Sequence, residues 1–212
     1  MELLKYRLAL GRWFRLVRSR LTAGRSRRNL QALRARAAEA AASFRPPHYL
    51  RAARLAGSLG LDSQALSLYG EAIDGYLETG RGRAAEVVCR EVVEAYPQVV
   101  RARRTLVLIA LGRGDAEEAA ALLRDYAETA KRFGDQRLTT KSLRAMGLIS
   151  EPGPLRSRAI AELNALGDEA GAQMVMEGKG VPQDEAFDAG AWSKALEAAL
   201  RGADELRDLR PT

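Results

Sequence analysis

The feature that most constrains this chain is a series of helix-forming segments that follow glycine turns and have small residues at their contact positions. "LGLDSQALSLYGEAI" (59–73) and "LGRGDAEEAAALLRDY" (111–126) both show this pattern, with alanine recurring at helical spacing. Short side chains let two helix axes approach to about 8 Å, the close end of the usual range. The chain is therefore expected to fold as closely packed helices.

Composition favours an all-α fold. Aromatic residues make up only 6% of the chain, whereas alanine, leucine and arginine, which lose little side-chain entropy in a helix, are abundant. β-branched residues form no alternating run longer than "EVVCREVV", which also fits a helix. The main helices are predicted at 48–59, 62–78, 82–96, 98–112 and 115–133. Further helices are predicted at 1–21, 30–44, 136–149, 154–167, 169–177 and 192–209.

Turn residues mark the ends of these helices. Asp115 followed by Glu118 is a capping-box arrangement. Pro97 suits the first turn of a helix, while the prolines of "RPPH" (45–48) are expected to end the helix before them. Loops of two to four residues favour antiparallel neighbours. Glycines placed to take the positive φ that closes a helix are Gly60, Gly80 and Gly112 or Gly114.

Residues 46–133 resemble the tetratricopeptide repeat, a 34-residue helix pair with small residues where its helices touch. Three stretches of the chain can be aligned with this repeat pattern. Ala85 and Ala119 are 34 residues apart, as the repeat length requires, but Ala65 and Ala85 are only 20 apart. The first two alignments therefore share the helix 62–78, and the repeats are irregularly spaced. The fits begin at Pro46 (Tyr49, Gly60, Ala65, Tyr69, Ala72), Leu66 (Tyr76, Gly80, Ala85, Pro97) and Val100 (Leu106, Gly114, Ala119, Leu123).

The resemblance implies an α-solenoid of antiparallel helix pairs whose first helices line a groove for a peptide or helix. The short side chains where helices touch would be those of Ala65, Ala72, Ala85 and Ala119. The larger side chains that fill the space between helix layers would be those of Tyr69, Tyr76, Leu123 and Tyr126. The family's lysine/asparagine clamp for a terminal carboxylate is absent from the expected lining. An ordinary alanine-rich bundle, with these charges merely solvated, is the alternative. The expected lining residues are Ser67, Glu71, Asp74, Glu78, Arg101 and Arg104.

Charge divides the chain unevenly. Residues 1–45 hold twelve Lys/Arg and two acids, whereas the other 167 residues hold 22 bases and 25 acids. A basic arm thus precedes a mildly acidic body, and the two are expected to have different tasks. We predict an arm over 1–45, repeats over 46–133 and a helical extension over 134–212 that caps the array.

The arm has an apolar stripe containing Tyr6, Trp13 and Phe14, as in an amphipathic helix. Three interpretations follow: docking into a protein partner or another copy of the chain, binding to an anionic membrane surface, or neutralising nucleic-acid phosphates. The aromatic residues favour the first two. The arm's basic residues are Lys5, Arg7, Arg12, Arg15, Arg18, Arg20, Arg25, Arg27 and Arg28.

The sequence offers little for catalysis. The only histidine, His48, has no partner expected beside it for nucleophilic or zinc chemistry, and the only cysteine, Cys89, is expected to be buried in a helix. No cofactor, metal or catalytic residue is therefore predicted. Charges interrupt the N-terminal apolar positions, and the longest nearby apolar run is "LVLIALG". The expected location is cytoplasmic, with attachment to the inner face of the membrane as one variant.

These observations predict a non-catalytic scaffold or adaptor. Its helical body would bind a protein partner, and its basic arm would dock it to a larger complex or membrane surface. The alternative is a nucleic-acid-associated factor whose arginine-rich arm binds RNA or DNA while the repeats recruit protein.

Overall fold

The structure, a computed structural model, describes residues 28–134 and 136–178. Every regular element in these ranges is helical, which confirms the all-α prediction there. The helices predicted at 1–21 and 192–209, and with them most of the basic arm, lie outside the described residues. Of the extension predicted over 134–212, the structure describes residue 134 and residues 136–178.

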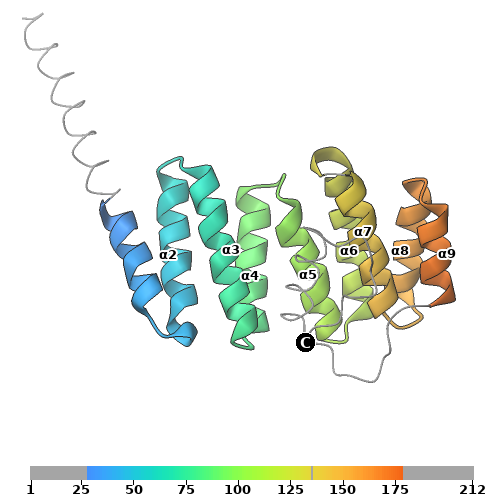
Figure 1. Cartoon of the computed structure of the whole chain (residues 1–212), viewed down its shortest axis with the longest axis horizontal. Coiled ribbons are helices and arrows are strands. Elements are labelled where there is room, and N and C mark those ends of the chain that lie inside the picture. Colours follow the sequence, from blue (N-terminus) through green and yellow to red (C-terminus); the bar gives the residue numbers. More distant parts are fainter. Residues whose placement is uncertain (1–27, 135, 179–212) are drawn as a thin grey trace, which may run out of the picture. The chain divides into compact units, whose positions relative to one another are not determined.

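Helix positions agree with the sequence prediction to within three residues for α2 to α9. Residues 28–39 are helical. The elements after them are η1 (Ala42–Phe44), α2 (Arg45–Ser58), α3 (Asp62–Glu78), α4 (Gly82–Ala95), α5 (Val100–Gly112), α6 (Ala116–Phe133), α7 (Gln136–Ile149), α8 (Pro154–Ala165) and α9 (Glu169–Glu177). Figure 1 shows their arrangement along the chain.

The proline positions differ from the prediction. The helix expected at 30–44 ends at residue 39, and Pro46 instead lies in the first turn of α2, where a missing N–H costs no helical hydrogen bond. Arg45 is helical with φ −61° and ψ −48°, although it precedes a proline. Pro97 lies in the turn before α5, which begins at Val100, and its carbonyl accepts a hydrogen bond from Arg103 Nη1 at 2.7 Å.

Contacts divide the chain into two compact units, residues 1–75 and 76–212, with the boundary inside α3. In the first unit, Gly75 of α3 lies directly over Pro46 of α2. A Cβ atom on Gly75 would be only 2.8 Å from Pro46 Cγ. Ala53 and Ala65 are also fully buried. Small residues therefore bring α2 and α3 close together, as the sequence predicted for helices in this region.

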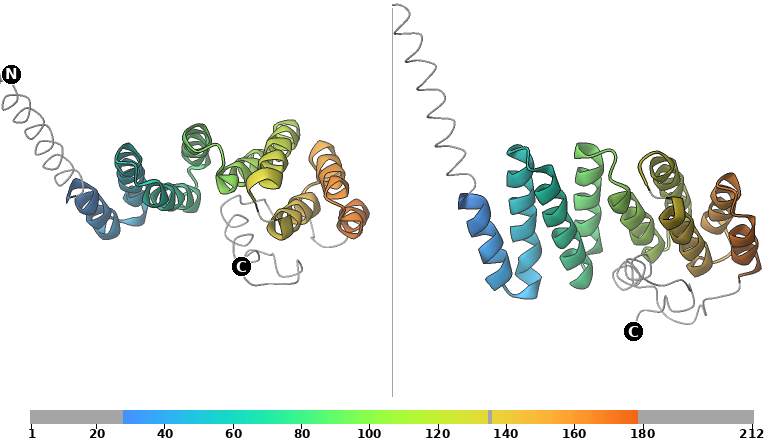
Figure 2. Two further views of the ribbon diagram at one scale, coloured as in Figure 1. Left: turned by 90° about the horizontal axis from the view of Figure 1, so that it is seen from above. Right: turned by 45° about the horizontal axis from the view of Figure 1, so that its top comes forward.

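In the second unit, α4 packs on α5 and α5 packs on α6. Farther along the chain, α8 contacts α6, α7 and α9, and α7 also contacts α9 (Figures 1 and 2). The helices from α5 to α9 contribute to one hydrophobic core. The buried core therefore continues beyond Gly134, where the sequence pattern becomes less regular.

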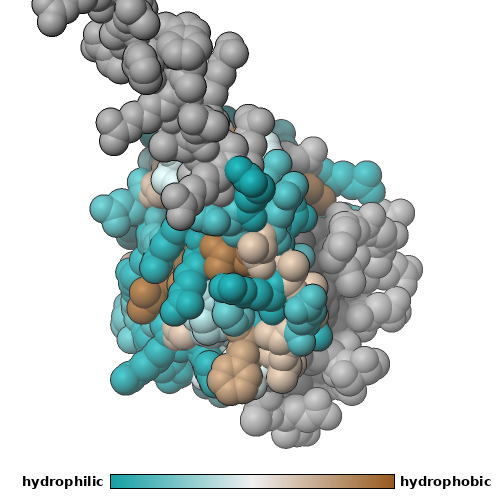
Figure 3. All heavy atoms as spheres, turned by 90° about the vertical axis from the view of Figure 1, so that its left-hand side faces the viewer, coloured by the Kyte–Doolittle hydropathy of each residue, from teal (hydrophilic) through white to brown (hydrophobic). Residues whose placement is uncertain are grey.

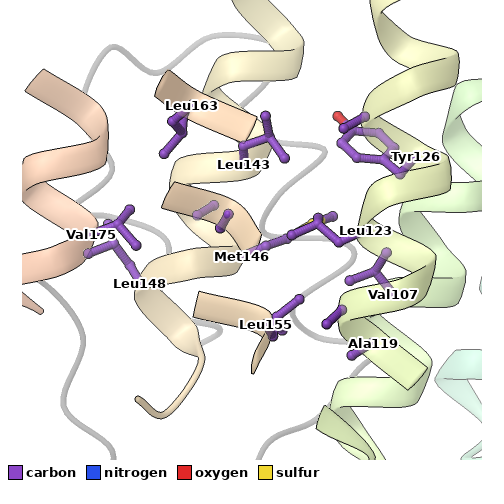
Figure 4. Packing of buried hydrophobic residues seen from close by; sticks show 14 of the residues in the cluster. Val107, Ala119, Leu123, Tyr126, Leu143, Met146, Leu148, Leu155, Leu163 and Val175 are labelled. Atoms are coloured by element: carbon purple, nitrogen blue, oxygen red, sulfur yellow. The ribbon is translucent and has the colours of Figure 1, made fainter. Parts of the chain in front are cut away.

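Figure 4 shows this core at close range, with side chains from successive helices interdigitated. Leu123 of α6, Met146 of α7 and Leu155 of α8 are completely or almost completely buried. Close-packed interiors of this kind tolerate little change in side-chain volume. Other buried members of the core are Val107, Ala119, Tyr126, Leu143, Leu148, Leu163 and Val175.

The residues predicted to form close helix contacts, and those predicted to fill the space between helix layers, are buried. Ala65, Ala72, Ala85 and Ala119 have no exposed surface, and Tyr69, Tyr76, Leu123 and Tyr126 are buried too. α7 also approaches its neighbours closely, because a Cβ atom on Gly147 would lie 3.1 Å from the Ala159 Cβ and 2.5 Å from Val175 Cγ1. Gly147 thus lets α7 meet both α8 and α9.

The predicted turn chemistry is largely present. Gly60, Gly80 and Gly114 have positive φ, whereas Gly112 is the last residue of α5. Asp115 caps α6 by accepting a hydrogen bond from the Glu118 N–H at 3.0 Å. The Glu118 carboxylate bonds to arginines rather than back to the cap, so only half of the capping box forms.

One face of the molecule is mostly polar. The face drawn in Figure 3 is largely hydrophilic, and its apolar side chains form small separate groups. Within the described ranges, none of the helices combines the length and hydropathy needed to cross a membrane. Large apolar side chains that are exposed in these ranges include Phe44, Val87, Phe133, Leu138, Met174 and Met176.

Candidate protein-binding surface

The predicted groove residues of α3 are mostly exposed. Ser67 and Glu71 are exposed and Asp74 is half-buried, and their spacing places them along one face of the helix. Glu78, also exposed, comes one turn later but belongs to the second unit. This face of α3 is acidic, which suits a basic segment of a partner.

The two predicted groove residues of α5 lie in different environments. Arg101 is exposed, whereas Arg104 has only 9% of its surface exposed. Burial lowers the pKa of Arg104, the nearby Tyr126 opposes this effect, and Arg101 adds to it. Arginine nonetheless stays charged at neutral pH. Because Arg101 and Arg104 belong to the second unit and Ser67, Glu71 and Asp74 to the first, their joint lining of a groove stays a prediction.

Arg103, between these two, has a structural role. Its Nε donates to Asp125 Oδ2 at 2.8 Å, and its Nη1 donates to the Pro97 carbonyl at 2.7 Å. Arg103 therefore ties α5 to α6 and to the turn before α5. The sequence alone does not separate this arginine from Arg101 and Arg104, because all three lie within one turn of the helix.

A second group of charges also acts within the fold. Arg90 of α4 contacts Glu86 at 2.8 Å and Glu118 of α6 at 2.9 Å. Arg113 contacts the same two carboxylates. The hydrogen bond from Arg90 is the largest cause that lowers the pKa of Glu86. This four-residue network joins α4 to α6 and the turn before it.

A shallow, open pocket of about 600 Å³ lies between α7 and the turn that joins α8 to α9. Arg137, Lys141 and Arg144 are spaced by four and three residues, so they share one face of α7. We call this feature the α7 pocket. It is lined by Gln136, Arg137, Thr140, Lys141, Arg144, Leu166, Gly167 and Asp168.

One ion pair fixes one side of the α7 pocket. Arg144 donates from Nε and Nη2 to the two oxygens of Asp168, each at 2.5 Å. Asp168 also caps α9 by accepting a hydrogen bond from the Gly171 N–H at 3.1 Å. The pKa of Asp168 is lowered, chiefly by the hydrogen bond from Arg144, so its carboxylate is ionised at neutral pH.

The α7 pocket was not predicted from the sequence. Its signal was present as Arg137, Lys141 and Arg144 on one helical face, but the matching wall, Leu166 to Asp168, is about two dozen residues farther along the chain. Three cationic side chains against one carboxylate make the pocket basic. Its chemistry suits an anionic group, and guanidinium and ammonium groups bind carboxylates well.

The two residues that the sequence offered for chemistry, His48 and Cys89, are at least partly buried. Cys89 is fully buried, and His48 is half-buried with its Nδ1 atom lacking a hydrogen-bond partner. Within the described ranges, no three residues of the types His, Cys, Asp and Glu are grouped to hold a metal ion. Arg28 of the arm is exposed. The arm's other predicted contact residues, including Tyr6, Trp13 and Phe14, lie outside the described residues.

Comparisons of this chain with protein-family models, with curated proteins and with solved structures find no match. The all-helical fold is compatible with a helical repeat, and the tetratricopeptide resemblance remains an expectation from the sequence.

Proposed function

We propose that this protein is a non-catalytic adaptor built as a tetratricopeptide-like solenoid of antiparallel helix pairs. Its helical body binds a protein partner, and its basic N-terminal arm docks it to a larger complex or to an anionic membrane surface. In this proposal the helices supply exposed faces for binding, and no reaction takes place on the chain.

The observation that carries the proposal is a recurring offset between buried residues of consecutive helices, most of which are small. Ala53 and Ala65 of α2 and α3 are 12 residues apart, and so are Gly147 and Ala159 of α7 and α8. Val107 and Ala119 of α5 and α6 have the same offset. A repeated spacing of buried residues in successive helix pairs is typical of a stacked array.

The surface chemistry also supports a macromolecular partner. The described α7 pocket is shallow, open and lined mainly by polar side chains, whereas small-molecule sites are usually deeper and largely apolar. The exposed face of α3 is acidic and that of α7 is basic. Such surfaces provide electrostatic complementarity, which speeds the association of proteins and selects among partners.

The test compares the full-length chain with Trp13→Ala/Phe14→Ala and with a variant that has Arg12, Arg15 and Arg18 changed to glutamine. Binding to vesicles of phosphatidylserine and phosphatidylcholine, to single-stranded RNA and to proteins captured by cross-linking is measured over a salt series. Loss of vesicle binding, or of one defined protein, in the aromatic variant supports docking by the arm. RNA binding that requires the arginines and falls steeply with salt would favour the nucleic-acid alternative.

Substitution is preferable to removing residues 1–45. Leu30 and Ala37 are buried, and η1 packs on α2, so that deletion would expose apolar surface of the body. Turnover of any substrate by the purified chain would contradict an adaptor function.

A further inference from the structure

The α7 pocket has a chemically matched segment in the same chain. Its lining carries Arg137, Lys141 and Arg144 against a single carboxylate, Asp168. The sequence "QDEAFD" (183–188) carries three carboxylates and no basic residue. We propose that the α7 pocket is a binding site for the acidic segment 184–188 of this chain.

The pocket provides the groups that such a segment needs. Arg144 already holds one carboxylate, that of Asp168, through two hydrogen bonds of 2.5 Å. This arrangement shows that the pocket wall accommodates a carboxylate in bidentate geometry. Lys141 and Arg137 lie about one and two turns nearer the start of α7 and add two positive charges, while the exposed Gln136 offers an amide donor.

The length of chain between the two sites allows the contact. Asp168 lines the pocket at the start of α9, and Gly178 follows the other end of the helix. The nine residues of α9 span about 13 Å at 1.5 Å per residue. Six residue steps from Gly178 to Asp184 cover up to about 20 Å when extended. Asp184 can therefore reach the pocket that lies beside the start of α9.

Attachment to the same chain makes a weak contact effective. Individual exposed ion pairs contribute little, but a short connection raises the effective concentration of the segment to about the millimolar range. The segment would therefore occupy the pocket through several modest contacts and leave when a more strongly bound acidic segment competes. The contact is also expected to weaken with salt, because the pocket is open to solvent.

The first experiment tests proximity by disulfide cross-linking in the full chain. Ala186→Cys is combined either with Thr140→Cys, inside the pocket, or with Glu151→Cys as a matched control. Glu151 follows Ser150, whose carbonyl accepts a hydrogen bond from Arg156, and Arg156 lies beside Gly178. The control is therefore closer to the end of α9 than the pocket is. The native Cys89 is fully buried and should not react.

Docking predicts that the Thr140→Cys pair forms its disulfide several-fold faster than the Glu151→Cys pair at low salt. The preference should disappear at 1 M salt, where the Debye length is about 3 Å, and in a chain that also carries Asp184→Asn, Glu185→Gln and Asp188→Asn. Equal rates, faster reaction of the Glu151→Cys pair, or a preference that survives neutralisation of the three acids would overturn the proposal.

A second measurement does not depend on introduced cysteines. A fluorescent peptide of residues 180–190 is titrated into the full chain carrying the three neutralised acids, and anisotropy reports binding. Lys141→Gln in that chain should weaken binding several-fold, whereas Arg124→Gln, an exposed arginine of α6 outside the pocket lining, should leave it unchanged. No binding, or equal weakening by both substitutions, would count against the site.

Discussion

Replacement of Gly147 by alanine tests the close helix packing on which this fold depends. The added Cβ would lie 2.5 Å from Val175 Cγ1 and 3.1 Å from both Val175 Cγ2 and the Ala159 Cβ. Carbon atoms in contact normally lie about 3.5–4.0 Å apart. Gly147, Ala159 and Val175 belong to α7, α8 and α9, so relief of the clash requires Val175 to leave its rotamer or one of these helices to move.

The magnitude follows from two opposing effects. Overpacking a well-filled core costs about 1–3 kcal/mol, while exchanging glycine for alanine within a helix gains about 1 kcal/mol. Gly147→Ala is therefore expected to change the stability of the second unit by between about 0 and 2 kcal/mol, in the destabilising direction. Val175→Ala alone removes two buried methyl groups and should cost about 2 kcal/mol.

The double variant distinguishes a steric clash from a general defect. When Val175→Ala removes both Cγ atoms, the new Cβ at Gly147 loses its closest contact and partly fills the vacated space. Gly147→Ala/Val175→Ala should then be about 1–2 kcal/mol more stable than the sum of the single effects predicts. Gly82→Ala is the matched control, because a Cβ there meets nothing within 4 Å. It should stabilise the chain by about 0.4–1 kcal/mol.

Urea denaturation followed by far-ultraviolet circular dichroism measures these differences, provided that the variants share one slope with urea. If Gly147→Ala stabilises the chain as Gly82→Ala does, or if the two core substitutions are additive, then α7 does not meet α8 and α9 at the proposed distance.

Three further predictions concern the charged groups. Asp168→Asn should cost about 2 kcal/mol at pH 7, because it weakens charge-assisted hydrogen bonds with Arg144 and the Gly171 N–H. Since the folded-state pKa of Asp168 is lowered, this stabilisation is present above about pH 4 and is lost as the pH falls through that pKa; urea titrations at pH 7 and pH 3 check the trend. Gly171→Ala should cost a similar amount and add little to Asp168→Asn, because its Cβ would collide with both Asp168 and Arg144; a double-mutant cycle that is fully additive contradicts this. Glu86→Gln should cost about 1 kcal/mol at low salt and less at 1 M salt, because the pair with Arg90 is partly exposed; thermal unfolding at both salt concentrations tests it.

Most of the helical architecture could be predicted from local chemistry. Gly60, Gly80 and Gly114 end helices with positive φ, and Asp115 caps the next helix, as their types and positions indicated. These signals are reliable because each depends on backbone conformation or on a hydrogen bond within a few residues. Proline was less informative. Pro46 fits the first turn of one helix as well as the end of another, so sequence alone did not decide its role.

The candidate site was harder to predict because it depends on the direction in which charged side chains lie. Arg101, Arg103 and Arg104 are close in sequence, yet Arg101 is exposed and Arg103 and Arg104 are buried. Helical periodicity places residues on faces but does not show which face another helix covers. Arg144 illustrates the same limit, since its partner Asp168 lies 24 residues away on the cap of α9.

The spacing of 12 residues between buried residues of consecutive helices also occurs beyond Gly134, where the repeat pattern in the sequence is less regular. A search for alanine finds Ala65, Ala85 and Ala119 but overlooks Gly147, whose role in α7 is equivalent because both residue types permit close approach. The pair Gly147 and Ala159 was therefore visible in the sequence, but only to a search that treats small residues as one class and looks for their spacing across a turn. Burial of Leu155 and Leu163 on either side of Ala159 completes the contact. Small residues thus permit close helix packing at this end of the chain, as they do between α2 and α3, although the small residues differ.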